Sequence, residues 1–305
     1  MSAFHNPVLL EETLALLVKE IDGIYIDSTF GGGGHSFSFL NKISNKGKLI
    51  AFDQDIDSIN HNNIFDARFN LVKSNFRFLK IILKQQNINY VSGILADLGI
   101  SSHQINTSKR GFSIRYDSLL DMRMDPSQKK NAKFIINNYS YNKLYNILIK
   151  YGEVKNAKKI ANIILKQRKK QILKTTFELK NLLACFFNFK TKLKNKFLSK
   201  IFQSLRIEVN DEINALKDLL NNSLSILKPG GRIAIISYHS LEDRIVKKFF
   251  KTGKFHGVVK YDLYGNNLSP LILLEPRVIF TSKKEIKQNN RSRSARLRIA
   301  EKKFK

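Results

Sequence analysis

Four consecutive glycines follow an acidic residue at the end of a short β-prone stretch. Residues 24–27 read Ile-Tyr-Ile-Asp, and glycine fills positions 31–34 directly before His35. Glycine adopts positive φ angles and lets the backbone approach a ligand closely, so a strand that runs into such a turn can hold a bound group at its end. A flexible surface loop is the alternative for this stretch alone. We interpret it as the first strand-to-helix turn of a nucleotide-binding sheet.

A second acidic residue, Asp53, lies 20 positions beyond Gly33 and ends the apolar run over 48–52. In a strand–helix–strand unit, an acid at the tip of the second strand reaches the hydroxyls of a bound ribose. A carboxylate can accept hydrogen bonds from both hydroxyls. The alternative is an exposed acid at a strand end. The glycine turn and the spaced acid together indicate a nucleoside ligand more specifically than either feature does alone.

A third acid, Asp97, follows another buried-strand pattern over 91–96. Ligands of open α/β sheets bind outside the carboxyl ends of the strands. We therefore expect Asp97 to lie at the same edge as the glycine turn and Asp53.

The remaining stretches indicate the elements that must position these side chains. Leucines at helical spacing over 205–227 predict one long helix, which ends at the Lys-Pro-Gly-Gly turn of residues 228–231. The pattern predicts an α/β fold, with strands over 24–26, 48–52, 69–73, 91–96, 232–237, 278–281 and 295–300.

Strand signals fade between residues 106 and 205, where basic amphipathic helices dominate. We expect a core formed by 1–105 and 206–305, with 106–205 as an inserted helical substrate-recognition domain. The run Lys-Gln-Arg-Lys-Lys over 166–170 is compatible both with a solvated helix face and with an RNA contact.

The charge composition of the chain indicates which classes of molecule it binds. Lys and Arg number 53 against 25 acids, a formal charge of +28. Such an excess predicts a polyanionic partner, nucleic acid first and an anionic membrane second, although the compositional drift of an AT-rich genome would also enrich lysine. The sequence has no apolar run of transmembrane length and no signal-like start, so we expect a cytoplasmic protein. The single Cys185 excludes an internal disulfide and is expected to be buried.

The form of the glycine turn distinguishes between cofactors. A dinucleotide dehydrogenase requires G-x-G-x-x-G, but the third position here is Ser36. The pattern Asp27-x-x-x-Gly31-x-Gly33, with Asp53 downstream and the turn at 228–231 before a late strand, resembles class I methyltransferases that bind S-adenosyl-L-methionine. That resemblance implies a Rossmann-like seven-stranded sheet and favours methyl transfer over hydride transfer.

The resemblance becomes closer over the whole chain. Eight ordered blocks look like the family of ribosomal RNA small-subunit methyltransferase H, also called MraW. The sequence departs from the usual pattern of that family at Gly32, Ser92 and His103. The eight blocks are residues 5–10, 27–35, 51–55, 96–104, 110–113, 121–126, 237–244 and 291–298.

The family resemblance implies a bacterial enzyme that methylates the exocyclic N4 amine of a cytidine in 16S ribosomal RNA, near the decoding site of the small subunit. It also implies a class I core interrupted by a helical domain. Carried over by position, the contacts of S-adenosyl-L-methionine are Gly33, Gly34, His35, Asp53, Phe76, Asp97 and Gln104.

The chemistry assigns Asp97 as the candidate catalytic residue. A cytosine amine is a poor nucleophile, and an acceptor for its hydrogens draws electron density to nitrogen and takes up the released proton. The Pro-Pro-aromatic segment common in amino methyltransferases of DNA is missing after Asp97, so we expect the base to be clamped by Tyr238 or Phe112.

Other candidate sites are weaker. Asp121 and Asp125 flank Arg123, which favours an ion-paired turn, and no metal is predicted. The arginine-rich tail over 291–298 is a candidate phosphate contact, or else an edge strand kept soluble by charge. Monomer and homodimer remain open. So do two rival functions, a class I methyltransferase acting on DNA or a small molecule, and a non-enzymatic RNA-binding assembly factor.

Overall fold

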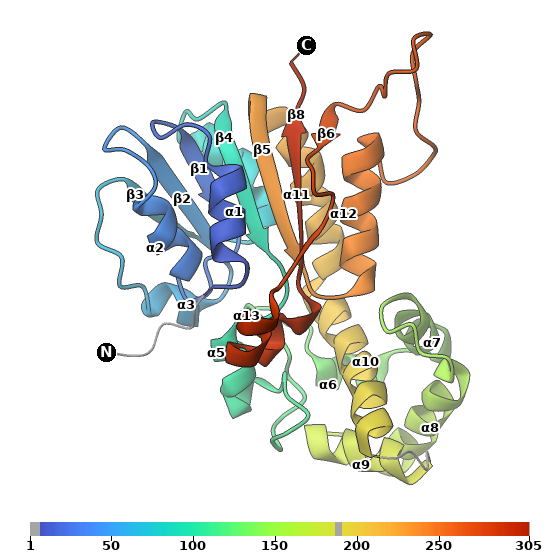
Figure 1. The fold of residues 1–305 in the computed structure, drawn as a ribbon. Coiled ribbons are helices and arrows are strands. Elements are labelled where there is room, and N and C mark those ends of the chain that lie inside the picture. Colours follow the sequence, from blue (N-terminus) through green and yellow to red (C-terminus); the bar gives the residue numbers. More distant parts are fainter. Residues whose placement is uncertain (1–6, 187–190, 305) are drawn as a thin grey trace. The chain divides into compact units, whose positions relative to one another are not determined.

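The computed structural model describes residues 7–186 and 191–304. The chain divides into two compact units. Figure 1 shows their elements, coloured along the sequence from blue at the N-terminus to red at the C-terminus. The first unit contains the residues up to Gly99 together with those from Ile213 onwards, and the second contains Ile100–Glu212. The sequence predicted boundaries at 105/106 and 205/206.

In the part of the chain that the structure describes, the first unit is built on a mixed sheet of eight strands. Its order is β3-β2-β1-β4-β5-β8-β6, with β7 also paired to β8. The strands β1 to β5 pair in parallel, and β8 is antiparallel to β5, β6 and β7. The bounds are β1 Ile24–Asp27, β2 Lys48–Asp53, β3 Phe69–Lys73, β4 Val91–Asp97, β5 Leu227–Ser237, β6 Leu271–Leu273, β7 Ile279–Phe280 and β8 Arg296–Lys302.

Helices cover both faces of this sheet because successive side chains of a buried parallel strand point to opposite faces. One apolar cluster joins Ile26, Ile94 and Ile235 to residues of the helices α4, α11 and α12. The other joins Tyr25, Leu95 and Ile236 to residues of α1 and α2. The helical elements of this unit are α1 Leu10–Leu17, α2 Gly34–Leu40, α3 Ile56–Asn60, η1 Phe76–Phe78, α4 Leu79–Gln85, α11 Glu212–Ile226, α12 Ser240–Thr252, α13 Lys283–Gln288 and η3 Asn290–Ser294.

The second unit is helical in its described residues, apart from one isolated bridge between Leu119 and Thr175. Its long helices pack through apolar faces, as in α8, where Ile160, Ala161 and Ile164 are buried. Its elements are α5 Ser102–Asn106, η2 Ser108–Arg110, α6 Ala132–Asn138, α7 Tyr141–Lys150, α8 Ala157–Lys170, α9 Thr176–Phe186 and α10 Thr191–Asn210.

Four sequence-based expectations are corrected. The sheet has eight strands rather than seven, because β6 adds a short strand that the sequence pattern did not indicate. The predicted helix over 205–227 is two helices, because Asp211 adopts a φ of 51° between them. Residues 228–231 lie inside β5 as an irregularity, since the parallel register jumps from Val91–Leu227 to Gly93–Arg232. Cys185 is exposed, not buried.

Candidate active site

The glycine turn connects β1 to α2. Gly31 and Gly33 have φ angles of 55° and 77°, the left-handed region that disfavours other residues. A Cβ on Gly33 would lie 2.8 Å from the Phe30 ring, and one on Gly34 would lie 2.5 Å from the Pro7 ring. Nothing lies within 4 Å of a Cβ on Gly32. Close contacts therefore require glycine at the third and fourth positions of the turn, which are two of the predicted cofactor contacts, and the φ angle favours glycine at the first.

Asp27, the last residue of β1, holds this turn in place through hydrogen bonds. Its carboxylate is fully buried and accepts hydrogen bonds from the Ser36 hydroxyl at 2.7 Å and from the Thr29 backbone N–H at 3.1 Å. Burial raises the pKa of Asp27. The bond from Ser36 links the end of β1 to the first turn of α2, so Ser36, the residue that breaks the dehydrogenase pattern, has a structural role.

Asp53 lies at the carboxyl end of β2, as predicted, and its carboxylate reaches the glycine turn. One oxygen accepts the Gly31 N–H at 2.8 Å, and the other accepts the Asp55 N–H at 2.8 Å. Burial raises the pKa of Asp53 to about 6. A carboxylate offers about four acceptor positions. The Ser58 hydroxyl is a further hydrogen-bond partner of Asp53, so one position is left for a ligand.

Phe76 begins the short helix η1 that follows β3. Its ring is partly exposed and packs against the same apolar cluster as α4 and α11. Asn75 caps η1 through the Arg77 N–H, and its amide donates to the Gln54 side chain at 2.8 Å. Since Gln54 follows Asp53, this bond joins the loop ends of two neighbouring strands and places Phe76 at the same edge of the sheet.

Asp97 forms the centre of a polar group at the end of β4. The Tyr238 hydroxyl donates to one carboxylate oxygen at 2.8 Å, and His35 Nδ1 lies 3.9 Å from the other. Burial raises the pKa of Asp97 to about 6, against the opposing effects of His35 and Tyr238. The pKa of Tyr238 is raised well above its usual value, mainly by burial, so its hydroxyl keeps its proton. Asp97 is thus a carboxylate that titrates close to neutrality.

His35 is held in one orientation. Its Nε2 lies 3.1 Å from the carbonyl oxygen of Val8, which only accepts, so Nε2 carries the hydrogen. Burial lowers the pKa of His35, and the nearby Asp97 carboxylate opposes this effect. This arrangement suits a positioning residue at the start of α2.

Sequence reasoning missed Thr29 and Glu242 as parts of this site. The Thr29 hydroxyl accepts the backbone N–H of Asp97 at 2.7 Å and so connects the ends of β1 and β4. Glu242 is buried and accepts the backbone N–H of Tyr238 at 2.9 Å. Its position four residues after Tyr238, at the start of a helix, is the signal that could have identified it.

The first unit therefore brings together six of the seven predicted cofactor contacts. Gln104 belongs to the second unit. There it is buried and forms the capping box of α5, in which the Ser101 hydroxyl accepts the Gln104 N–H and the Gln104 side chain accepts the Ser101 N–H. Phe112, one candidate clamp for the base, is buried in the second unit with the Arg110 guanidinium 5.9 Å from the centre of its ring.

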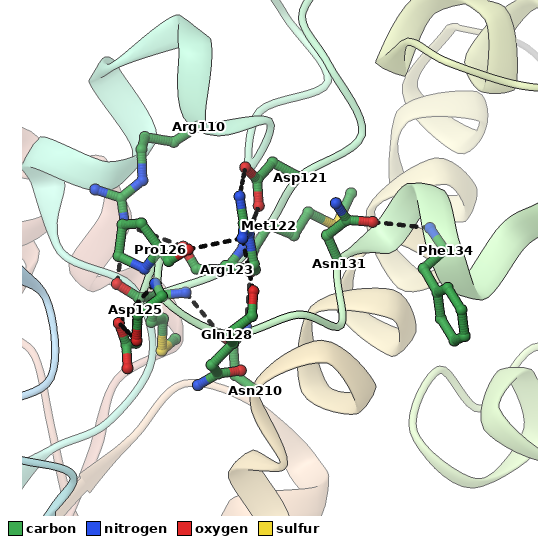
Figure 2. A network of polar contacts seen from close by, with 12 residues as sticks. Arg110, Asp121, Met122, Arg123, Asp125, Pro126, Gln128, Asn131, Phe134 and Asn210 are labelled. Carbon is green, nitrogen blue, oxygen red and sulfur yellow. Dashed lines mark hydrogen bonds and ion pairs between the residues drawn. The ribbon is translucent and has the colours of Figure 1, made fainter.

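The predicted ion-paired turn around Arg123 is confirmed (Figure 2). Its guanidinium contacts both carboxylate oxygens of Asp121, at 2.6 and 2.9 Å, and donates to the carbonyl oxygens of Pro126 and Gln128. The Asn210 side chain holds the same turn through the backbone of Met122 and Met124. This network within the second unit fixes the loop before α6.

One of the two sequence-based interpretations of the arginine-rich tail is wrong, whereas the phosphate contact stays a prediction for the exposed Arg293. The strand β8 is an interior strand with partners on both sides, so it is no edge strand. Arg298 is buried and pairs with the buried Asp243 at 2.7 Å, and Arg296 pairs with the same carboxylate at 2.9 Å. Arg298 therefore holds β8 to α12 and is not available to a phosphate.

Within residues 7–186 and 191–304, no helix has the length and apolar character to span a bilayer. Comparison with known proteins places this chain among its relatives. It is 73% identical over 304 residues to a protein of Karelsulcia muelleri named ribosomal RNA small subunit methyltransferase H, with 100% of both chains covered. Proteins of the same name from Flavobacterium johnsoniae and Cytophaga hutchinsonii are 49% and 50% identical over 299 residues, covering 98% of this chain and 98% and 99% of theirs. The model of the MraW methylase family matches residues 2–303, and the chain belongs to that family.

Proposed function

We propose that this protein transfers the methyl group of S-adenosyl-L-methionine to the exocyclic N4 amine of a cytidine in the decoding region of 16S ribosomal RNA. The observation that carries the proposal is the Asp97 carboxylate, held by Tyr238 and set beside the glycine turn at the end of β4. Full-length relatives named as methyltransferases of the small ribosomal subunit support the substrate.

The residues present fit the methyl donor. Asp53 keeps an acceptor position for a ribose hydroxyl, and Phe76 offers a partly exposed ring for the adenine. The glycine turn brings backbone close to the same edge. When bound, the donor supplies an electrophilic methyl group on a sulfonium. Gly33, Gly34, His35, Asp53, Phe76 and Asp97 of the first unit would hold it.

Asp97 then acts on the amine. With a pKa of about 6, the carboxylate is mostly ionised above neutral pH and accepts an N–H of the cytosine amine. That contact would orient the lone pair of the amine nitrogen toward the methyl group, and the Asp97 carboxylate would accept the proton that the amine releases. The hydroxyl of Tyr238 keeps one carboxylate oxygen turned toward it, and His35 Nδ1 lies 3.9 Å from the other.

The substrate is polyanionic and the protein carries a net charge of +28. Phosphate contacts position an RNA, and the target cytidine must leave its stack to enter the site. The helical second unit is the candidate for part of this recognition, and the cytoplasm, where ribosomal subunits are assembled, is the compartment in which the reaction would occur.

Methyl transfer tests the proposal directly. Small ribosomal subunits from cells lacking this enzyme are incubated with the protein and tritiated S-adenosyl-L-methionine, and the label is mapped by nuclease digestion and mass spectrometry. We expect N4-methylcytidine at one position of 16S ribosomal RNA. Label on DNA, on another base, or no label in RNA bound tightly by the protein would instead support one of the rival functions.

A further inference from the structure

The segment between α12 and β6, residues 253–270, stands out from the sheet unit as a finger (Figure 1). Its outer part exposes large apolar side chains. Leu263 is 101% exposed, Tyr264 90% and Val258 82%, and Tyr261 and Leu268 are also exposed. Five such residues within eleven positions exceed the scattered single residues that a protein surface normally shows, and such a patch indicates an interaction site.

The finger has a defined structure. At its tip, the Asp262 carboxylate accepts the backbone N–H groups of Tyr264 at 2.9 Å and Asn266 at 2.8 Å. Below the tip, Tyr261 and Asn267 form an antiparallel bridge. At its base, the Asn267 amide donates to the Lys251 carbonyl at 3.0 Å. The two tyrosines are therefore presented by an ordered hairpin.

A row of cations leads along α12 to this finger. Three exposed cations lie on one face of α12, at spacings of three and four residues: Arg244, Lys247 and Lys251. Lys254 continues the row at the base of the finger. The two acids of α12, Glu242 and Asp243, are buried. No acidic residue occurs between positions 244 and 261. The exposed face thus carries charge of one sign.

The helix that carries this row starts next to the candidate active site. Tyr238, which contacts Asp97, lies two residues before Ser240, the first residue of α12. The 13 residues of α12 extend for about 20 Å at 1.5 Å per residue. A polyanion that enters the site can therefore continue along α12 to the finger.

We propose that the exposed face of α12 and the finger form a docking surface for RNA that flanks the methylated nucleotide, with phosphates on Lys247, Lys251 and Lys254 and a base stacked on Tyr264. The proposal rests on the proposed function for the identity of the RNA. Nucleic acid is the occupant because it alone combines regular negative charge with flat apolar bases, and tyrosine faces with basic neighbours are the typical surface for single strands. A protein partner would need acids to match the row on α12.

Charge variants test the phosphate contacts without relying on methyl transfer. Binding of small-subunit RNA is measured from 50 to 300 mM KCl for wild type, Lys247→Gln/Lys251→Gln and the control Lys80→Gln/Lys84→Gln. The control removes two exposed lysines at the same spacing on α4. We expect the slope of log K against log salt to fall by about 1.4 only for the α12 pair, since each single-strand phosphate contact contributes about 0.7. Equal slopes for both pairs would overturn the proposal.

Stacking is tested at the tip of the finger. We expect Tyr264→Ser to weaken RNA binding by about 5- to 100-fold, the range for loss of one stacked base, and Tyr90→Ser, another exposed tyrosine of the same unit, to leave it unchanged. A photocrosslinking phenylalanine analogue at position 264 should label 16S ribosomal RNA in small subunits. A crosslink to a ribosomal protein instead would overturn the RNA assignment. Because binding and crosslinking need no turnover, they remain informative if no methyl group is transferred.

Discussion

The Asp97 carboxylate combines two opposing demands. Folding leaves its side chain 23% exposed, and this partial burial raises its pKa to about 6, whereas accepting a proton from an amine requires the ionised form. The Tyr238 hydroxyl and His35 partly offset the cost of burial. In its proposed role, a carboxyl with this raised pKa would serve activity at the expense of stability, a combination typical of functional sites.

Replacing Asp97 by Asn should separate the two effects. We expect methyl transfer to fall by about 10²- to 10⁴-fold because the amide cannot take up the proton. At pH 8 we expect the variant to be more stable than wild type by about 2 kcal/mol, because it avoids ionising a carboxyl whose pKa lies above its ordinary 3.8. Urea unfolding and single-turnover labelling give the two numbers.

The pH dependence gives a further check on the same residue. The native protein holds the Asp97 proton up to about pH 6 and the unfolded chain loses it near 3.8, so this group lowers stability as pH rises through that window. The difference in unfolding free energy between wild type and Asp97→Asn should therefore shrink below pH 4. A constant difference from pH 4 to pH 8 would contradict the assignment.

Turnover should rise with pH around a midpoint near 6, and Tyr238→Phe should move that midpoint to higher pH. The variant removes a hydrogen bond that lowers the pKa of Asp97 and favours the charged form. The pH profile of single-turnover methylation with bound donor measures the shift. Tyr25→Phe is the control, since the Tyr25 hydroxyl bonds to the Glu20 backbone, away from Asp97. Identical profiles for Tyr238→Phe and wild type would show that Tyr238 does not tune the carboxylate.

At the scale of elements, the turn between β1 and α2 depends on which glycine is changed. Gly33→Ala should destabilise the fold by about 1–2 kcal/mol or more, because φ is 77° and the new Cβ would meet the Phe30 ring at 2.8 Å. It should also weaken binding of S-adenosyl-L-methionine. Gly32→Ala is the matched control, since its Cβ would meet nothing within 4 Å. Thermal unfolding and calorimetric titration measure both effects, and equal losses from the two variants would be inconsistent with this geometry.

The packing of β8 on α12 relies on a buried ion pair. Asp243→Ala should cost about 3–5 kcal/mol, because it leaves the Arg298 guanidinium buried without its carboxylate. Arg296→Ala removes a partner whose side chain is 42% exposed and should cost less than about 1 kcal/mol. Urea unfolding compares the two, and a loss below 1 kcal/mol for Asp243→Ala would show that the pair is not needed.

Some helices and strands have a recognisable sequence pattern, and others do not. The four strands β1 to β4 were predicted because each is a short apolar run ending at a polar residue or turn. The strand β6 has only three residues and no pattern of its own; its pairing with β8 creates it. The break at Asp211 was missed because the helical spacing of leucines continues across a single residue in the left-handed region.

The same limit applies to the site. Asp53 and Asp97 could be placed at one edge because the carboxyl ends of parallel strands share it. The Tyr238–Asp97 bond joins residues 141 positions apart, and no local pattern encodes it. The role of Arg298 depends on a buried partner from α12, so from the sequence alone it resembled an exposed phosphate ligand.

At the scale of the whole molecule, positive charge is concentrated in the second unit. Its 113 residues hold 24 Lys and Arg against 8 acids, a net charge of +16, whereas the 192 residues of the first unit hold 29 against 17, a net charge of +12. A cavity of about 410 Å³ in the second unit is lined by Lys129, Lys133 and Arg168 and by no acid. Compositional drift alone would distribute lysine evenly, so this bias favours a polyanion.

The basic run on α8, residues 166–170, allows the proposed binding of RNA by the second unit to be tested residue by residue. The Arg168 guanidinium donates to the carbonyl oxygens of Ile136 and Tyr139, at 3.1 and 2.7 Å, so it caps α6 and is structural. The three lysines of the run, Lys166, Lys169 and Lys170, are exposed. Their joint replacement by Gln should reduce the salt slope of binding to small-subunit RNA by about 2, at 0.7 per phosphate contact, and leave binding of S-adenosyl-L-methionine unchanged. The control replaces the three exposed lysines at positions 42, 46 and 48 of the first unit. If both triple variants keep the wild-type slope, the run on α8 is a solvated face; if both lower it equally, the charge acts without regard to position and the second unit has no special part in recognition.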